Sequence, residues 1–109
     1  QTINDTNVLI QHVAVDNPAA LRGLADRLKD KIKSGIVVVG SVKGPKAFLI
    51  VGVTKDLTDR YHAGNIIKKI APIVGGGGGG RPDLAQAGGT QPAKLDQALK
   101  EARNIIANS

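Results

Sequence analysis

The residues best suited to chemistry are six consecutive glycines followed by an arginine, Gly75–Gly80 and Arg81. Ordering a glycine inside an element costs roughly 0.5–1 kcal/mol more than ordering an alanine, so stability does not explain the run. Two interpretations stay open. The run is a flexible linker, or it is a loop whose bare backbone lets another chain approach closely and whose N–H groups bind an anion. In the second case, Arg81 adds a forked cation for phosphate, guanine or carboxylate.

Positive charge is concentrated in the middle of the chain. The 109 residues include 15 Lys and Arg against 9 Asp and Glu, a net charge of +6. The window from Lys29 to Arg81 has ten basic and three acidic residues (+7), so the remainder sums to −1. This distribution fits an anionic partner, most often nucleic acid, although a solvated surface has a similar composition. On electrostatic grounds the candidate contacts are extended to four lysines, Lys43, Lys46, Lys68 and Lys69.

Several kinds of site are excluded by what the sequence lacks. It has no cysteine, which removes disulfides, thiolate metal sites and cysteine nucleophiles. It has two histidines, no serine in a nucleophile elbow and no pair of carboxylates in an active-site motif. We therefore expect no catalytic residue and no metal site. With Phe48 and Tyr61 as the only aromatic residues, stacking of several bases is excluded. The apolar runs are too short for a membrane helix, so we expect no membrane partner.

Hydrophobic patterning predicts the elements that position these residues. Apolar runs at 8–15, 36–42 and 47–53 indicate strands, the first two of them parallel, and Lys43-Gly44-Pro45-Lys46 predicts an antiparallel hairpin. Helical stripes follow Pro18, extend from about 64 to 74, and occupy 92–107. We predict an α/β (α+β) fold with a small mixed sheet of three or slightly more strands, covered by about three helices. The glycine-rich segment is expected to be a loop before the C-terminal helix, residues 1–7 the end of a linker, and 8–109 a single C-terminal globular domain.

A resemblance to a known family covers the chain from Val8 to Ile106. It rests on Asp56-Leu57-Thr58, on Ala63-Gly64, and on the segment from Gly75 to Gly89, which contains G-G-G-R-P-D-L-A-Q-A-G-G. These residues closely resemble the C-terminal domain of bacterial alanyl-tRNA synthetase, within the DHH-associated domain family. The last of the three motifs is long and specific.

The resemblance implies a non-catalytic, tRNA-binding domain that contacts the elbow of alanine tRNA and aids aminoacylation and editing. It implies that the glycine run and Arg81 are contacts. It further implies a cytoplasmic parent enzyme, an alanine–tRNA ligase of protein biosynthesis, with aminoacylation and editing domains upstream. ATP and zinc are expected only in those upstream domains, and no cofactor is expected here. Some members of the family also form homodimers.

Two alternatives of different classes stay open. The same fold class occurs in DHH-type phosphodiesterases, where the glycine run typically leads into a histidine that contacts nucleotide phosphate. Arg81 follows the glycines here, which weakens that interpretation. The other alternative is a dimerisation or interaction module with little affinity for RNA. Many synthetase relatives have a charged residue within the glycine run, whereas this run is all glycine.

Overall fold

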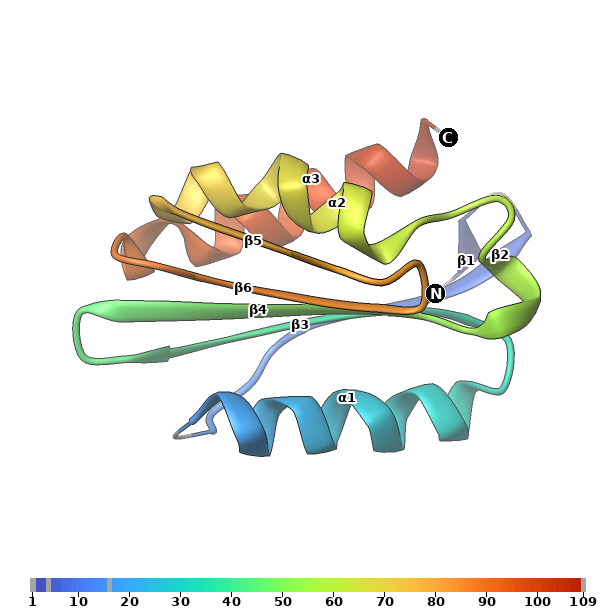
Figure 1. Ribbon diagram of the computed structural model, residues 1–109, viewed down its shortest axis with the longest axis horizontal. Coiled ribbons are helices and arrows are strands. Elements are labelled where there is room, and N and C mark those ends of the chain that lie inside the picture. The colour runs from blue at the N-terminus through green and yellow to red at the C-terminus, as the bar shows by residue number, and fades with distance from the viewer. Residues whose placement is uncertain (1, 4, 16, 109) are drawn as a thin grey trace.

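The computed structural model describes residues 2–3, 5–15 and 17–108 as one six-stranded sheet between helices (Figure 1). Helix α1 covers one face of the sheet, and helices α2 and α3 cover the other. The strands and α-helices, in chain order, are β1 Thr2–Ile3, β2 Thr6–His12, α1 Pro18–Ile32, β3 Gly35–Lys43, β4 Lys46–Val53, α2 Ala63–Ile70, β5 Gly76–Gly80, β6 Leu84–Gly89 and α3 Leu95–Ala107. Short 3₁₀ turns occupy Lys55–Leu57, Ala71–Val74 and Pro92–Lys94.

The sheet is mixed, with strand order β1-β2-β3-β4-β6-β5. Strands β2 and β3 are parallel and joined by α1, and the other neighbouring pairs are antiparallel. The hairpin between β3 and β4 closes at the pair Lys43↔Lys46. The predicted fold class, with its mixed sheet, antiparallel hairpin and three helices, is therefore confirmed. The sheet has six strands because β1 extends one edge and the glycine-rich segment supplies β5 and β6.

The strand predicted at 8–15 is β2, and it lies earlier in the chain than its apolar pattern indicates. β2 begins at Thr6 and ends at His12, whereas the sequence predicted 8–15. Thr6 is only 3% exposed. Strand β1 also falls within the residues assigned to a linker, of which Gln1 and Asn4 lie outside the described residues. The division into linker and domain stays a prediction.

Helix α1 begins at a side-chain cap. The Asn17 side chain accepts a hydrogen bond from the Ala20 backbone N–H at 2.7 Å, and Pro18 fits the first turn because it has no N–H to satisfy. Leu21 and Ala25 are fully buried against Val37, Val39 and Ile50 of the sheet. The opposite face has the larger core, to which α2 and α3 contribute Ile66, Ile67, Ile70, Leu95, Leu99 and Ile106.

The segment after α1 is tied to the segment after β4. The Ser34 hydroxyl donates to Asp56, and the Gly35 N–H donates to the Thr54 hydroxyl at 3.0 Å. Hydrogen bonds to Ser34 and Thr54 lower the pKa of the Asp56 carboxyl, because they favour its charged form. These contacts fix where β3 starts relative to the end of β4.

The glycine run forms a strand, so the prediction of a loop is wrong. β5 pairs with β6 from Gly76↔Gly89 to Gly80↔Ala85. A Cβ atom on Gly76, Gly78 or Gly80 would lie 2.7, 2.6 or 2.6 Å from the Cα of its β6 partner. No side chain fits at that distance. The absence of side chains lets β5 pack directly on β6, and the ladder hydrogen bonds offset the entropy cost on which the loop prediction rested.

Contact with β6 does not explain the other three glycines of the run, Gly75, Gly77 and Gly79. Gly75 has a φ of +73° at the end of the preceding 3₁₀ turn, a conformation that L residues rarely adopt. Gly77 has no atom within 4 Å of a Cβ position, and at Gly79 the nearest atom is Lys68 Cε at 4.0 Å. The fold therefore needs bare backbone at alternate positions of β5 but not at Gly77 and Gly79.

Replacing Gly78 and Gly77 separately tests this division. Gly78→Ala is expected to lower the free energy of unfolding by about 1–3 kcal/mol, because the methyl group must displace β6 backbone. Gly77→Ala is expected to leave stability unchanged or raise it by about 0.4–1 kcal/mol, because the unfolded chain loses entropy. Denaturant unfolding of the two variants measures both. Equal losses would show that β5 does not pack as described.

Candidate nucleic-acid interface

Arg81 lies in the tight turn between β5 and β6, and its backbone N–H donates a hydrogen bond to the Leu84 carbonyl at 2.9 Å. Its side chain is 67% exposed, and its Nε lies 3.4 Å from Asp83 Oδ1. Asp83 is itself held by Lys29 of α1, whose Nζ donates to the Asp83 carbonyl at 3.0 Å and lies 4.0 Å from its carboxylate. Arg81 is thus oriented by one contact at Nε, and most of its side chain is exposed.

A hollow of about 200 Å³ opens beside this arginine. Arg22 of α1 and Arg81 both line it, and the backbone of Gly79 and Gly80 contributes to its wall. Sequence reasoning missed Arg22 as a site residue. No local pattern in the sequence marks Arg22, because its place beside Arg81 depends on how α1 lies over the sheet.

The four candidate lysines lie in three places. Lys68 of α2 reaches the region of Gly79. Lys69 lines a separate hollow between α2 and α3, together with Glu101 and Asn104. Lys43 and Lys46 lie at the hairpin tip, at the other end of the sheet from Arg81. The register from Lys46 to Gly52 spans six residues along β4, or about 20 Å.

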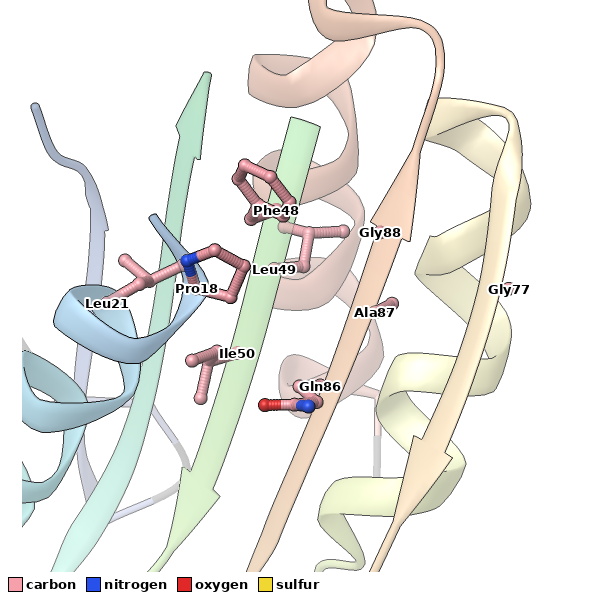
Figure 2. A pocket seen from close by; sticks show the side chains of 9 residues that line it. All are labelled: Pro18, Leu21, Phe48, Leu49, Ile50, Gly77, Gln86, Ala87 and Gly88. Atoms are coloured by element: carbon pink, nitrogen blue, oxygen red, sulfur yellow. The ribbon is translucent and has the colours of Figure 1, made fainter. Parts of the chain in front are cut away.

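A second hollow, of about 310 Å³, lies between these two basic ends. Pro18 and Leu21 of α1 line one side of it, and Figure 2 shows Phe48, Ile50 and Gln86 projecting from β4 and β6 toward that side. Gly88 and Gly77 supply bare backbone, and Gln86 lines both hollows. The two hollows together are called the glycine groove below. It consists of Pro18, Leu21, Arg22, Phe48, Leu49, Ile50, Gly77, Gly79, Gly80, Arg81, Leu84, Ala85, Gln86, Ala87 and Gly88.

The glycine run does not form the cradle of successive N–H groups considered from the sequence. In a strand, consecutive N–H groups point to opposite sides, whereas an anion-binding nest requires them to converge. The N-terminal N–H groups of α2 are also occupied, since Ala63 and Gly64 donate to the carbonyls of Pro82 and Arg81. An anion at the glycine groove would therefore be held by side-chain cations.

The two histidines each contact a neighbouring polar group and lie on different elements. Among residues 2–3, 5–15 and 17–108, there is no cluster of three or more His, Asp or Glu side chains able to hold a metal ion. His12 Nδ1 lies 3.0 Å from Asp96 Oδ1 on an exposed surface, and His62 caps α2 by accepting from the Asn65 N–H. None of the helices in the described part of the chain is both long and apolar enough to cross a membrane.

Comparison with known proteins gives the family. A family model described as the DHHA1 domain matches residues 5–108. The chain belongs to the DHHA1 domain family. This DHHA1 domain superposes with a TM-score of 0.90 on the C-Ala domain of alanyl-tRNA synthetase from Aquifex aeolicus, with 34% identity over 98% of this chain and 96% of that one. The resemblance to the synthetase C-terminal domain is therefore confirmed.

Curated relatives agree with that match. The DHHA1 domain is 56% identical to an alanine–tRNA ligase of Desulfosudis oleivorans over 106 residues, and 53% identical to one of Exiguobacterium sibiricum over 100 residues. These alignments cover 97% and 91% of this chain but only 12% and 11% of those proteins. A DHH-domain protein described as a member of the s1p family of ribosomal proteins aligns with a TM-score of 0.57 at 18% identity, over 90% of this chain and 26% of that one, a likeness of fold alone.

Lys29 rather than Arg81 should hold the turn between β5 and β6. Lys29→Ala leaves the Asp83 carbonyl without its donor and the partly buried carboxylate with Arg81 alone as its cation, so we expect the free energy of unfolding to fall by about 1–3 kcal/mol. Lys31→Ala, at an exposed position of the same helix, is the matched control and should change it by less than about 0.5 kcal/mol. Thermal and denaturant unfolding measure both. Equal stability of the two variants would contradict the anchoring role.

Proposed function

We propose that this DHHA1 domain is the non-catalytic tRNA-binding module of an alanyl-tRNA synthetase, and that it binds tRNA through the glycine groove and the cations around it. The partner is alanine tRNA, contacted at its elbow. In this proposal the domain helps the aminoacylation and editing domains of a cytoplasmic parent ligase act on one bound tRNA, and ATP and zinc serve those other domains.

The observation that carries the proposal is the combination of charge and bare backbone at one place. Arg22 and Arg81 line the same hollow, Lys68 reaches its edge, and the residues lining the glycine groove include no acid. Gly77 and Gly79 supply backbone that is free of side chains although the fold leaves room for them. A phosphodiester chain needs cations for its phosphates and an uncluttered surface for close approach.

The similarity to the C-Ala domain of a synthetase supports RNA as the partner that this surface binds. The C-Ala match extends over nearly the whole of both chains, and the basic window and the scarcity of aromatics favour recognition of backbone and shape. Lys43 and Lys46 extend the positive potential to the far end of the groove in this proposal, and Lys69 contributes through long-range attraction. A dimer that ignores tRNA is the outcome that would favour an interaction module instead.

Arg81→Ala tests the proposal directly. We expect it to weaken binding of alanine tRNA by about 1–3 kcal/mol, because the variant has no guanidinium to form a charge-assisted hydrogen bond with phosphate. The slope of log affinity against log salt should also become shallower, by roughly 0.7–0.9 for each phosphate that Arg81 neutralises. Fluorescence anisotropy of labelled tRNA at several salt concentrations measures both quantities.

Lys100→Ala is the matched control, since Lys100 is exposed on α3, on the opposite side of the sheet from α1. It removes one positive charge and should change affinity and salt slope much less than Arg81→Ala. Unfolding stability should be nearly unchanged in both variants. Equal effects of the two substitutions on tRNA binding, or an affinity that does not depend on salt, would contradict the proposal.

A further inference from the structure

Phe48 is placed unlike the other aromatic residue of the chain. Tyr61 is 4% exposed within the large core, whereas Phe48 is partly buried on the α1 side of the sheet and lines the glycine groove (Figure 2). In register, Phe48 pairs with Gly88, and Gly88 pairs with Gly77. Two neighbouring strands thus present bare backbone beside the ring.

The fold does not require either of these two glycines for steric reasons. A Cβ on Gly88 would lie 3.8 Å from Ala47 O and 3.9 Å from Phe48 Cδ1, which are ordinary contacts, and one on Gly77 would meet nothing within 4 Å. Neither residue has a positive φ. Side chains at these positions would fill the space next to the ring, so their absence keeps a flat apolar surface open.

The shape and chemistry of this space fit a planar group with a polar edge. Pro18, Leu21 and Ile50 supply apolar walls beside the Phe48 ring. The Gln86 side chain, which can both donate and accept hydrogen bonds, lies farther along the groove toward Arg22 and Arg81. The hairpin lysines at the other end share the face of Phe48, since residues 46 and 48 of β4 are two apart.

We propose that the Phe48 end of the glycine groove stacks one base of the bound RNA and that Gln86 hydrogen-bonds to the edge of that base. The inference rests on the proposed function. Cations at both ends of an apolar space favour a nucleotide over an apolar peptide or a second copy of this chain, because the sugar–phosphate chain enters and leaves past positive charge. One stacked base is compatible with a chain whose other aromatic ring is buried in the core.

Phe48→Trp supplies a reporter, because the chain contains no tryptophan. F48W keeps an aromatic ring at the position, so we expect it to bind alanine tRNA and its fluorescence to be quenched as tRNA is added. Heparin, a polyanion without bases, should bind and leave the fluorescence unchanged. Phe48→Leu, which keeps an apolar side chain but loses the ring, should weaken tRNA binding about fivefold or more, and Phe48→Tyr should retain it.

Gly88→Ala tests base stacking without changing the Phe48 ring. Its methyl group fits the fold and occupies the stacking surface, so it should weaken tRNA binding while thermal stability is kept. If F48W is not quenched by tRNA, or is quenched equally by heparin, base stacking is overturned. Unchanged tRNA affinity in both Phe48→Leu and Gly88→Ala would also overturn it.

The same variants distinguish failure of the stacking inference from failure of the proposed function. If Arg81→Ala still weakens tRNA binding while the Phe48 and Gly88 variants do not, the groove binds RNA by its phosphates alone and only the stacking inference fails. If the parent chain shows no affinity for tRNA, both fail. Fluorescence of F48W that changes with protein concentration in the absence of RNA would identify a second copy as the occupant and overturn the stacking inference.

Discussion

Direct packing of the β5 backbone on the β6 backbone is the constraint on which the rest of the structure depends. Where Gly76, Gly78 and Gly80 would have side chains, β6 already lies. The same closeness extends to α2, since a Cβ on Gly64 would lie 2.8 Å from Gly80 O. Helix α2 can therefore lie close to the end strand (Figure 1). Its isoleucines are part of the large core.

The opposite side of β5 is bare although this constraint does not require it. Because side chains alternate along a strand, the packing on β6 needs glycine only at positions 76, 78 and 80. Gly77 and Gly79 lie on the opposite side, next to Phe48 and Arg22, where the sheet extends beyond the cover of α1. Lys29 then fixes the turn that presents Arg81 at the end of the same surface. One strand thus serves both the packing of the domain and the surface proposed to meet RNA.

Much of the fold could be predicted from hydrophobic period alone. The continuous apolar, β-branched runs of β3 and β4 and the apolar stripes of α1 and α3 identify those elements without tertiary information. β5 could not be found this way, because glycine has low strand propensity and its pairing depends on contacts with β6 and α2. The alternation of apolar and polar residues at Ala85, Gln86 and Ala87 is a weak local signal that a strand follows the glycines.

The candidate site was only partly accessible from the sequence. Arg81 and Lys68 could be chosen from charge and from their neighbours in the chain. Arg22 could not, because its proximity to Gly79 depends on how α1 lies over the sheet. Lys43 and Lys46 share the positive sign of Arg81 but lie at the other end of β4, a separation that composition does not reveal.

The most direct measurement of the central claim is the affinity of the double variant Gly77→Ala/Gly79→Ala for alanine tRNA, together with its unfolding temperature. Both added methyl groups have room in the free domain. The account predicts a domain at least as stable as the parent whose tRNA affinity is lower by about tenfold, since close backbone approach is blocked. An equally stable variant that binds tRNA as tightly as the parent would contradict it.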